Sequence, residues 1–251
     1  MNQDYRDAFA ALHVPGDPVL LYNIWDVGSA HAVAAGGAKA LATGSHAVAE
    51  ANGYPDGEGI PFNLFLDCTR RIARAVELPV TADFESGFAV DAARVADHAR
   101  YLAETGVVGC NFEDQEIGGP ALHPIAEQAR RVAAVVESGL WVNARTDLFL
   151  RKLIAGENPN DRSLQGEALE RAHAYAEAGA HSFFIPGVSD LELIAEVCAA
   201  SPLPVNVIKP DALGIPALAQ AGVGRISWGP RPWRWAMERL TGEARAVYGA
   251  G

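Results

Sequence analysis

The sequence contains only three cysteines, Cys68, Cys110 and Cys198, and they are widely spaced. An odd number of distant cysteines forms neither a disulfide framework nor a C-x-x-C metal motif, so we expect buried thiols in a reducing, cytoplasmic protein. The chain also lacks an apolar run of about 18 residues that could cross a membrane. Its start, MNQDYRDAFAALHVPGDP, has no apolar signal-peptide core.

Basic residues are also few. The 31 Asp and Glu residues outnumber the 20 Lys and Arg residues, which gives a formal net charge of −11. Nucleic acids and anionic membranes attract basic surfaces, so this balance excludes both as expected partners. A small anionic ligand is still allowed, because one local metal ion or arginine is enough to hold it.

What the sequence does contain is a regular alternation of strand-like and helix-like segments. Short β-rich apolar runs occur at 19–23, 40–45, 79–84, 109–114, 140–145, 181–186, 204–209 and 225–230, separated by Ala-rich amphipathic segments. Eight such units in one chain predict an α/β fold of the (β/α)8 TIM-barrel class, with residues 1–251 forming a single domain. An open doubly wound sheet is disfavoured because no G-x-G-x-x-G follows the first strand.

Several glycines mark the predicted helix ends. Gly36, Gly106, Gly179 and Gly222 each precede a strand-like run, and we expect each to take the left-handed conformation that stops a helix. The longest irregular stretches, 46–61 and 151–162, follow predicted strands. In a barrel such loops lie at the carboxyl ends of the strands, where active sites form.

Charged residues stand where the apolar runs end. In PVTADFESGF, Asp83 and Glu85 are two positions apart and point to one side of an extended chain, while Glu113 and Arg145 end the next two runs. Like charges that share a site repel each other unless a cation lies between them. The other polar residues expected at this mouth are Tyr22, Asn23, Asp26, Thr43, Ser45, Asn111, Asp114, Asn143, Asp147, Asn206 and Lys209.

Three carboxylates with little His or Cys nearby favour a hard cation such as Mg2+, or Mn2+. The alternative interpretation is that these acids cap helices or pair with basic residues at the rim. The guanidinium of Arg145 can bind a carboxylate bidentately, and Ser45, with the N–H groups of His46 and Ala47, can bind a second one. A metal ion beside one arginine suits a dicarboxylate or a 2-oxo acid.

Five pieces, in this order, resemble the isocitrate lyase/phosphoenolpyruvate mutase superfamily: LYNIWDVGSA, ATGSHAVAEANGYPDGEG, PVTADFESGF, GCNFEDQ and VNARTDLFL. The resemblance covers about residues 8 to 240. It implies a TIM barrel of the phosphoenolpyruvate/pyruvate type, a Mg2+ ion, and a 2-oxo or 2-hydroxy acid whose C–C or C–P bond is broken or moved.

The resemblance also implies roles for individual residues. Asp83 matches the direct metal ligand, and three further acids match positions that bind the ion through water: Glu85, Glu113 and Asp56 of GYPDGEG. Ser45 and its neighbouring amides match the site for the substrate carboxylate, and Arg145 matches the substrate-binding arginine.

One loop departs from the better-known members. Isocitrate-cleaving lyases carry a lysine-cysteine-glycine-histidine motif there, whereas EDQEIGGPALHPIAEQARRV has neither lysine nor cysteine and so lacks the proton-transferring thiol. The mutases and phosphonopyruvate hydrolases that the chain resembles carry a DK-x-FPK-x-N type of loop instead. This loop is also absent, which disfavours phosphonate chemistry.

The group of the superfamily that remains as a match is its short members, which resemble oxaloacetate decarboxylases and hydrolases. Decarboxylation requires little beyond the metal and a proton returned to C3, from Tyr22, His46 or a metal-bound water. A hydrolase of the same substrates, which needs an activated water beside the C2 carbonyl, and a barrel that only binds a 2-oxo acid are the alternatives.

Two further segments carry structural expectations. We expect His123 to be a solvated loop histidine. The segment RPWRWAMERL at 231–240 is predicted to be the eighth helix, with Trp233 packing on the barrel or on another subunit. Its apolar surface favours a homo-oligomer, a dimer or a tetramer.

Overall fold

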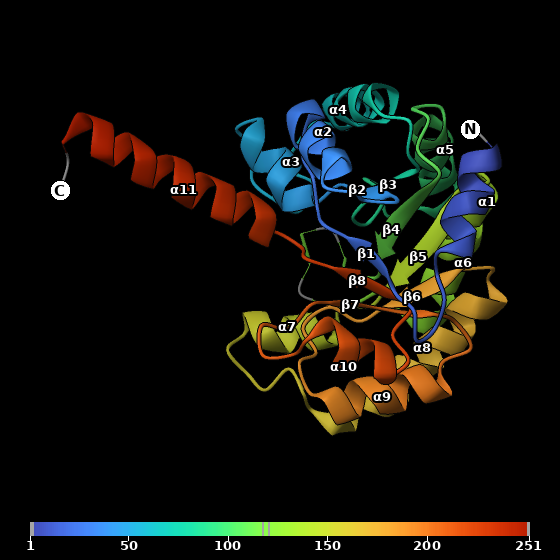
Figure 1. The fold of residues 1–251 in the computed structure, drawn as a ribbon. Helices are drawn as coiled ribbons and strands as arrows, with labels where there is room; N and C mark the ends of the chain where they lie inside the picture. The colour runs from blue at the N-terminus through green and yellow to red at the C-terminus, as the bar shows by residue number, and fades with distance from the viewer. Residues whose placement is uncertain (1–2, 117, 120, 250–251) are drawn as a thin grey trace.

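The computed structural model describes residues 3–116, 118–119 and 121–249 (Figure 1). Eight parallel strands lie in the order β1-β8-β7-β6-β5-β4-β3-β2, and the isolated parallel bridge between Ile24 and Thr43 joins the two ends of this series into a nearly closed barrel. The strands are β1 Val19–Leu21, β2 Leu41–Ala42, β3 Val80–Asp83, β4 Gly109–Glu113, β5 Trp141–Arg145, β6 Ser182–Phe184, β7 Val205–Ile208 and β8 Arg225–Ser227. The predicted (β/α)8 class is confirmed, and each strand falls within its predicted run.

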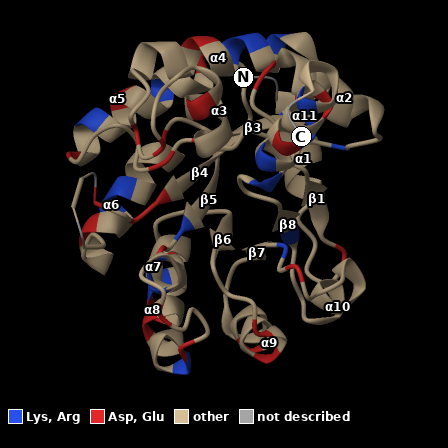
Figure 2. Ribbon diagram, turned by 90° about the vertical axis from the view of Figure 1, so that its left-hand side faces the viewer, with Lys and Arg blue, Asp and Glu red and all other residues tan. Residues whose placement is uncertain are grey.

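Helices alternate with the strands and surround them. They are α1 Gln3–Ala11, α2 Val27–Ala35, α3 Ser45–Ala51, α4 Phe62–Ala75, α5 Ala92–Ala103, α6 Ile125–Val136, α7 Leu148–Ile154, the 3-10 turn η1 Arg162–Leu164, α8 Gln165–Glu177, α9 Leu191–Ala200, α10 Ile215–Gln220 and α11 Arg231–Tyr248. A parallel strand is covered on both faces, which is why all five residues of β4 are buried. Acidic and basic residues are interspersed over the outer helices (Figure 2).

Helix α5 illustrates how the local sequence sets an element. The side chain of Asp91 accepts hydrogen bonds from the N–H groups of Ala93 and Arg94, which caps the first turn. Val95, Ala99 and Leu102 then bury one face of the helix, at the three-to-four-residue spacing that a helix requires.

Two local expectations were wrong. Gly106, Gly179 and Gly222 do have positive φ, but Gly36 has φ −71° and the left-handed residue is Gly37, at φ 93°. With two consecutive glycines, the helix extends one residue further before it stops. The stretches 46–61 and 151–162 are only partly irregular, because α3 extends to Ala51 and α7 to Ile154.

The C-terminal segment forms the predicted helix α11, and its first turns contact the barrel through Trp233 on Trp25 and Trp235 near Tyr22. The rest of the helix projects away from the barrel (Figure 1), and Pro232 is its buried residue. Packing on the barrel is therefore limited to the start of the helix. None of the described helices combines the length and apolarity needed to cross a membrane.

Candidate active site

The carboxyl ends of strands β3, β4 and β5 bring the predicted charged residues together. Asp83, Glu113 and Arg145 are the last residues of these strands. The register pairs Asp83 with Asn111 and Glu113 with Arg145, so neighbouring strands end side by side. Parallel strands end at the same edge of a sheet, and these side chains therefore share one mouth.

Asp83 connects three elements at this mouth. Its Oδ2 accepts a hydrogen bond of 3.1 Å from the backbone N–H of Ser45 at the start of α3, and its Oδ1 lies 3.3 Å from Asn111 Nδ2 on β4. Its own N–H donates to Thr43 Oγ1 at the end of β2. The carboxylate is thus oriented from α3 and from β4, and the Asp83 backbone is held by Thr43.

Arg145 lies between two carboxylates. Its Nη1 is 2.6 Å from Glu113 Oε2, and its Nε and Nη2 donate to the two oxygens of Asp147. Burial disfavours the charged form of Arg145, but Asp147 and Glu113 outweigh it and raise its pKa well above the usual value. A guanidinium carries five N–H groups, so two are left for a ligand. Glu113 therefore pairs with a basic residue at the rim, as the alternative interpretation of the sequence predicted.

A buried network fixes this arginine. Asp114 is fully buried, and its carboxylate accepts hydrogen bonds from Arg171 Nη1, the Tyr175 hydroxyl and the N–H of Asp147. Asp114 therefore holds the backbone of Asp147 in place, and the Asp147 carboxylate accepts two hydrogen bonds from Arg145.

Glu85 lies beside Asp83 but in an unusual backbone conformation. Its φ is 50°, in the left-handed region that costs a residue with a Cβ about 1–2 kcal/mol. Its Oε2 accepts a 2.7 Å hydrogen bond from the N–H of Glu58 in the loop after α3. Burial, together with the negative charges of Asp83 and Asp56, raises the pKa of Glu85 to about 8. Burial likewise raises the pKa of Glu58 to about 7.

The donor chemistry of this cluster fits a hard divalent cation. The charges of Asp83, Asp56 and Glu58 all act on the buried Glu85, and a cation among them relieves that repulsion. Within the described ranges, no group of three or more His, Cys, Asp or Glu side chains is arranged to hold an ion directly. A site in which one acid binds the ion and the others bind its waters does not need such a group.

The remaining predicted residues divide into two sets. His46 and Ala47 follow Ser45 in α3, and His46 Nδ1 lies 3.7 Å from Asp56 Oδ2. Tyr22 is 38% exposed after β1, with its ring 5.5 Å from that of Trp228. Asn206 is instead fully buried inside the barrel, where its amide bonds to Asn143 and to backbone carbonyls.

Nearly the whole chain matches one family of known proteins. The model of the family Phosphoenolpyruvate phosphomutase matches residues 9–248. The chain belongs to this family. Its superfamily, which includes isocitrate lyase, consists of enzymes, as the sequence predicted.

Individual relatives of this family are similar over most of their length. A solved structure from Burkholderia cenocepacia J2315, named provisionally as a phosphonomutase, is 41% identical, with a TM-score of 0.92 over 96% of this chain and 99% of that one. An oxaloacetate decarboxylase of Pseudomonas putida is 28% identical over 232 residues, which are 88% of this chain and 77% of the relative. An uncharacterized protein of Mycobacterium tuberculosis is 31% identical over 245 residues, 96% of this chain and 88% of that protein.

In this family member, the described residues of the loop after β4 bond to one another and to the end of the strand. His123 is only 2% exposed, its N–H donates to the carbonyl of Asp114, and its Nδ1 lies 3.7 Å from Glu127. The expectation of a solvated histidine was wrong, because the His123 backbone is bonded back to Asp114, directly after β4. Gln115 Nε2 helps by donating to the carbonyls of Gly119 and Ala121.

Sequence reasoning missed two residues that support the site. Arg225 on β8 is 1% exposed, and its Nη2 donates to Asn111 Oδ1, the amide whose Nδ2 faces Asp83. Burial lowers the pKa of Arg225 to about 9. An arginine inside the apolar run GVGRISW was the available signal. Glu58 is the second residue, and nothing in its sequence context separates it from an exposed loop acid.

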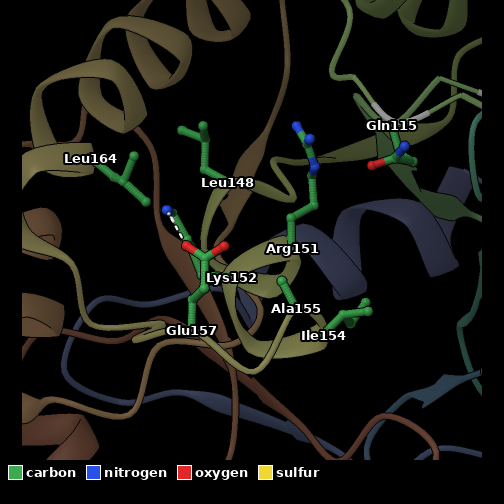
Figure 3. A pocket seen from close by; sticks show the side chains of 8 residues that line it. All are labelled: Gln115, Leu148, Arg151, Lys152, Ile154, Ala155, Glu157 and Leu164. Atoms are coloured by element: carbon green, nitrogen blue, oxygen red, sulfur yellow. Dashed lines mark hydrogen bonds and ion pairs between the residues drawn. The ribbon is translucent and has the colours of Figure 1, made fainter.

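A cavity of about 560 Å³ lies next to the ends of β4 and β5 (Figure 3). Gln115 and Leu148, which follow Asp114 and Asp147 in the sequence, line it together with residues of α7. Lys152 Nζ and Glu157 Oε2, from two residues that line it, form an ion pair of 2.5 Å. None of its lining residues is among the predicted site residues.

Proposed function

We propose that the protein is a Mg2+-dependent carbon–carbon lyase that acts on a small 2-oxo (di)carboxylic acid, with decarboxylation of an oxaloacetate-like substrate as its reaction. The observation that carries the proposal is the position of Asp83, whose carboxylate meets the Ser45 amide on one side and the acidic cluster on the other. The similarity to an oxaloacetate decarboxylase over 88% of the chain supports this substrate class.

Four acids would hold the ion, Mg2+ or Mn2+: Asp83 directly, and Glu85, Glu113 and Asp56 through water. When bound, the ion supplies Lewis-acid stabilisation of the negative charge that develops as the C–C bond breaks. Two of these acids are held in place within the protein: Asp83 by α3 and Asn111, and Glu113 by Arg145.

Substrate carboxylates would be bound at two places. The Ser45 hydroxyl with the N–H groups of His46 and Ala47 binds the C1 carboxylate, since the Ser45 N–H is already given to Asp83. Arg145 binds the remote carboxylate with its two remaining N–H groups. Asn206, which was predicted to bind substrate, is fully buried and bonded to Asn143 inside the barrel, so we assign it no substrate contact.

The proton that returns to C3 comes from Tyr22, from His46 or from water. Tyr22 is 38% exposed and packs beside Trp228, and His46 Nδ1 lies 3.7 Å from Asp56 Oδ2. Decarboxylation leaves an enolate at C3, and either group is a suitable type of proton donor.

A product analysis tests the proposal. Oxaloacetate is incubated with the protein and Mg2+, and products are followed by NMR against the spontaneous reaction. Pyruvate and CO2 are expected. Oxalate and acetate would make the protein a hydrolase of the same substrate, and Mg2+-dependent binding of unchanged oxaloacetate would make it a binding protein.

Broader expectations for the domain, location and partners accompany the function. We propose that residues 1–251 form one barrel domain, located in the cytoplasm, with neither nucleic acid nor membrane as partner. We also propose a homo-oligomer, a dimer or tetramer. The part of α11 beyond the barrel exposes Leu240, Val247 and Tyr248, which supports self-association.

A further inference from the structure

The loop of residues 53–60 approaches the acidic cluster in a strained conformation. The non-glycine residues with positive φ in the described chain are Glu58 at 60°, Glu85 at 50° and Phe88 at 56°. They come from two loops, one between α3 and α4 and the other between β3 and α5. Strain of this kind persists only where the surrounding contacts hold it in place.

Hydrogen bonds join these three residues in a chain. The N–H of Glu58 donates to Glu85 Oε2 over 2.7 Å, and the N–H of Phe88 donates to Glu58 Oε1 over 2.8 Å. The two loops are therefore linked in both directions: backbone of the first to side chain of the second, and side chain of the first to backbone of the second. Glu58 takes part in both links.

The two loops differ in how else they are held. The loop after β3 is anchored from α6, where the buried Arg131 donates through Nη2 to the carbonyls of Ser86 and Ala89. The loop of 53–60 is tightly folded, since a Cβ on Gly59 would lie 2.4 Å from the Pro55 carbonyl oxygen. Glu58 connects this second loop, and the Asp56 it carries, to the anchored one.

We propose that Glu58 is a positioning residue, which sets the placement of Asp56 and Glu85 around the metal ion through its two hydrogen bonds. This role rests on the metal site of the proposed function. Glu58 itself does not contact the substrate. Its carboxylate is occupied by the backbone of the neighbouring loop.

Three variants of the full chain test the role. Glu58→Ala removes the acceptor for Phe88, Glu58→Gln keeps an acceptor oxygen of the same reach, and Glu77→Ala changes an exposed glutamate at the opposite end of β3. The readouts are Mn2+ affinity by calorimetry and hydrogen exchange of the backbone amides of residues 53–60. Circular dichroism confirms that each variant is folded.

Glu58→Ala should weaken Mn2+ binding about 10–100-fold, as loss of a residue that orients metal ligands typically does. It should also speed exchange in 53–60, while Glu58→Gln and Glu77→Ala stay near the original protein. Equal Mn2+ affinity and exchange in Glu58→Ala and the original protein would overturn the proposal, as would a loss that Glu58→Gln fails to restore.

Failure of the proposed metal site gives a different result. If the original protein binds no Mn2+, the proposed function loses its metal, and hydrogen exchange alone decides the link. Faster exchange in Glu58→Ala but not in Glu58→Gln then supports the positioning of the loop, and unchanged exchange refutes it.

Discussion

The backbone N–H of Ser45 lies 3.1 Å from Asp83 Oδ2 and donates a hydrogen bond to it. The carboxylate at the end of β3 thus lies beside the first turn of α3, where a substrate carboxylate is expected. A ligand bound by the Ser45 hydroxyl and an ion bound by Asp83 would be neighbours. The proposed chemistry requires this adjacency.

Asp83→Asn should abolish Mn2+ binding while leaving the fold intact. The amide keeps the shape of the carboxylate and can still accept the Ser45 N–H, but it lacks the charge that a hard cation requires. Calorimetric titration with Mn2+ measures the effect, and Asp67→Asn on the outer helix α4 is the control. Mn2+ affinity equal to that of the original protein would place the ion elsewhere.

Arg145→Met should lower both substrate affinity and stability. The substitution leaves Glu113 and Asp147 buried without their common partner, and removal of one member of a buried ion pair costs about 3–5 kcal/mol. Urea denaturation measures the loss in the free energy of unfolding. Arg145→Lys should recover little, because an ammonium cannot contact both carboxylates in the same plane. An unchanged unfolding free energy in Arg145→Met would contradict this arrangement.

His13 should make the protein less stable as the pH falls. Burial, with the charge of Arg225 adding to it, lowers the pKa of His13 from 6.5 to about 3 in the folded state. The unfolded chain therefore takes up the proton first, and the stability present above pH 6.5 is lost progressively between pH 6.5 and about 3.

Between pH 7 and pH 5 this loss amounts to about 2 kcal/mol. His13→Phe keeps a ring against Phe9 and Trp141 but has no proton to gain, so its unfolding free energy should change less over that range. Urea denaturation at the two pH values compares them. The same pH dependence in both proteins would show that His13 is protonated as easily in the folded state.

Phosphonopyruvate should not be turned over, although a relative that is 41% identical carries a provisional phosphonomutase name. The loop after β4 has no lysine, and its Asp114 and Gln115 are engaged within the protein. Phosphorus NMR in the presence of Mg2+ follows the substrate directly. Formation of phosphate or of phosphoenolpyruvate would assign the protein to phosphonate chemistry instead.

The strands and the charged mouth could be predicted because each depends on a local pattern. A buried parallel strand requires a continuous apolar run, and acids that follow such runs, like Asp83 and Glu113, must gather at one edge. The same pattern cannot show pairing between strands. Arg145 was expected to bind a substrate carboxylate, and pairing of the acids with basic residues at the rim was the alternative. Only the structure shows that Arg145 is bonded to Glu113 and Asp147.

Residues whose role depends on contacts far away along the chain could not be predicted from the sequence. Glu58 acts on Phe88, which is 30 positions away, and Arg225 acts on Asn111, 114 positions away. His123 is buried because its backbone N–H bonds back to the Asp114 carbonyl, and its place in a loop between a strand and a helix does not indicate this contact. Local periodicity carries no information on such contacts.

The most direct test of the account is the rate of oxaloacetate decarboxylation with and without Mg2+, in the original protein and in Asp83→Asn. We predict Mg2+-dependent formation of pyruvate above the spontaneous rate in the original protein, and none above it in the variant. A rate that is independent of Mg2+, or equal in the two proteins, would contradict a metal-dependent lyase centred on Asp83.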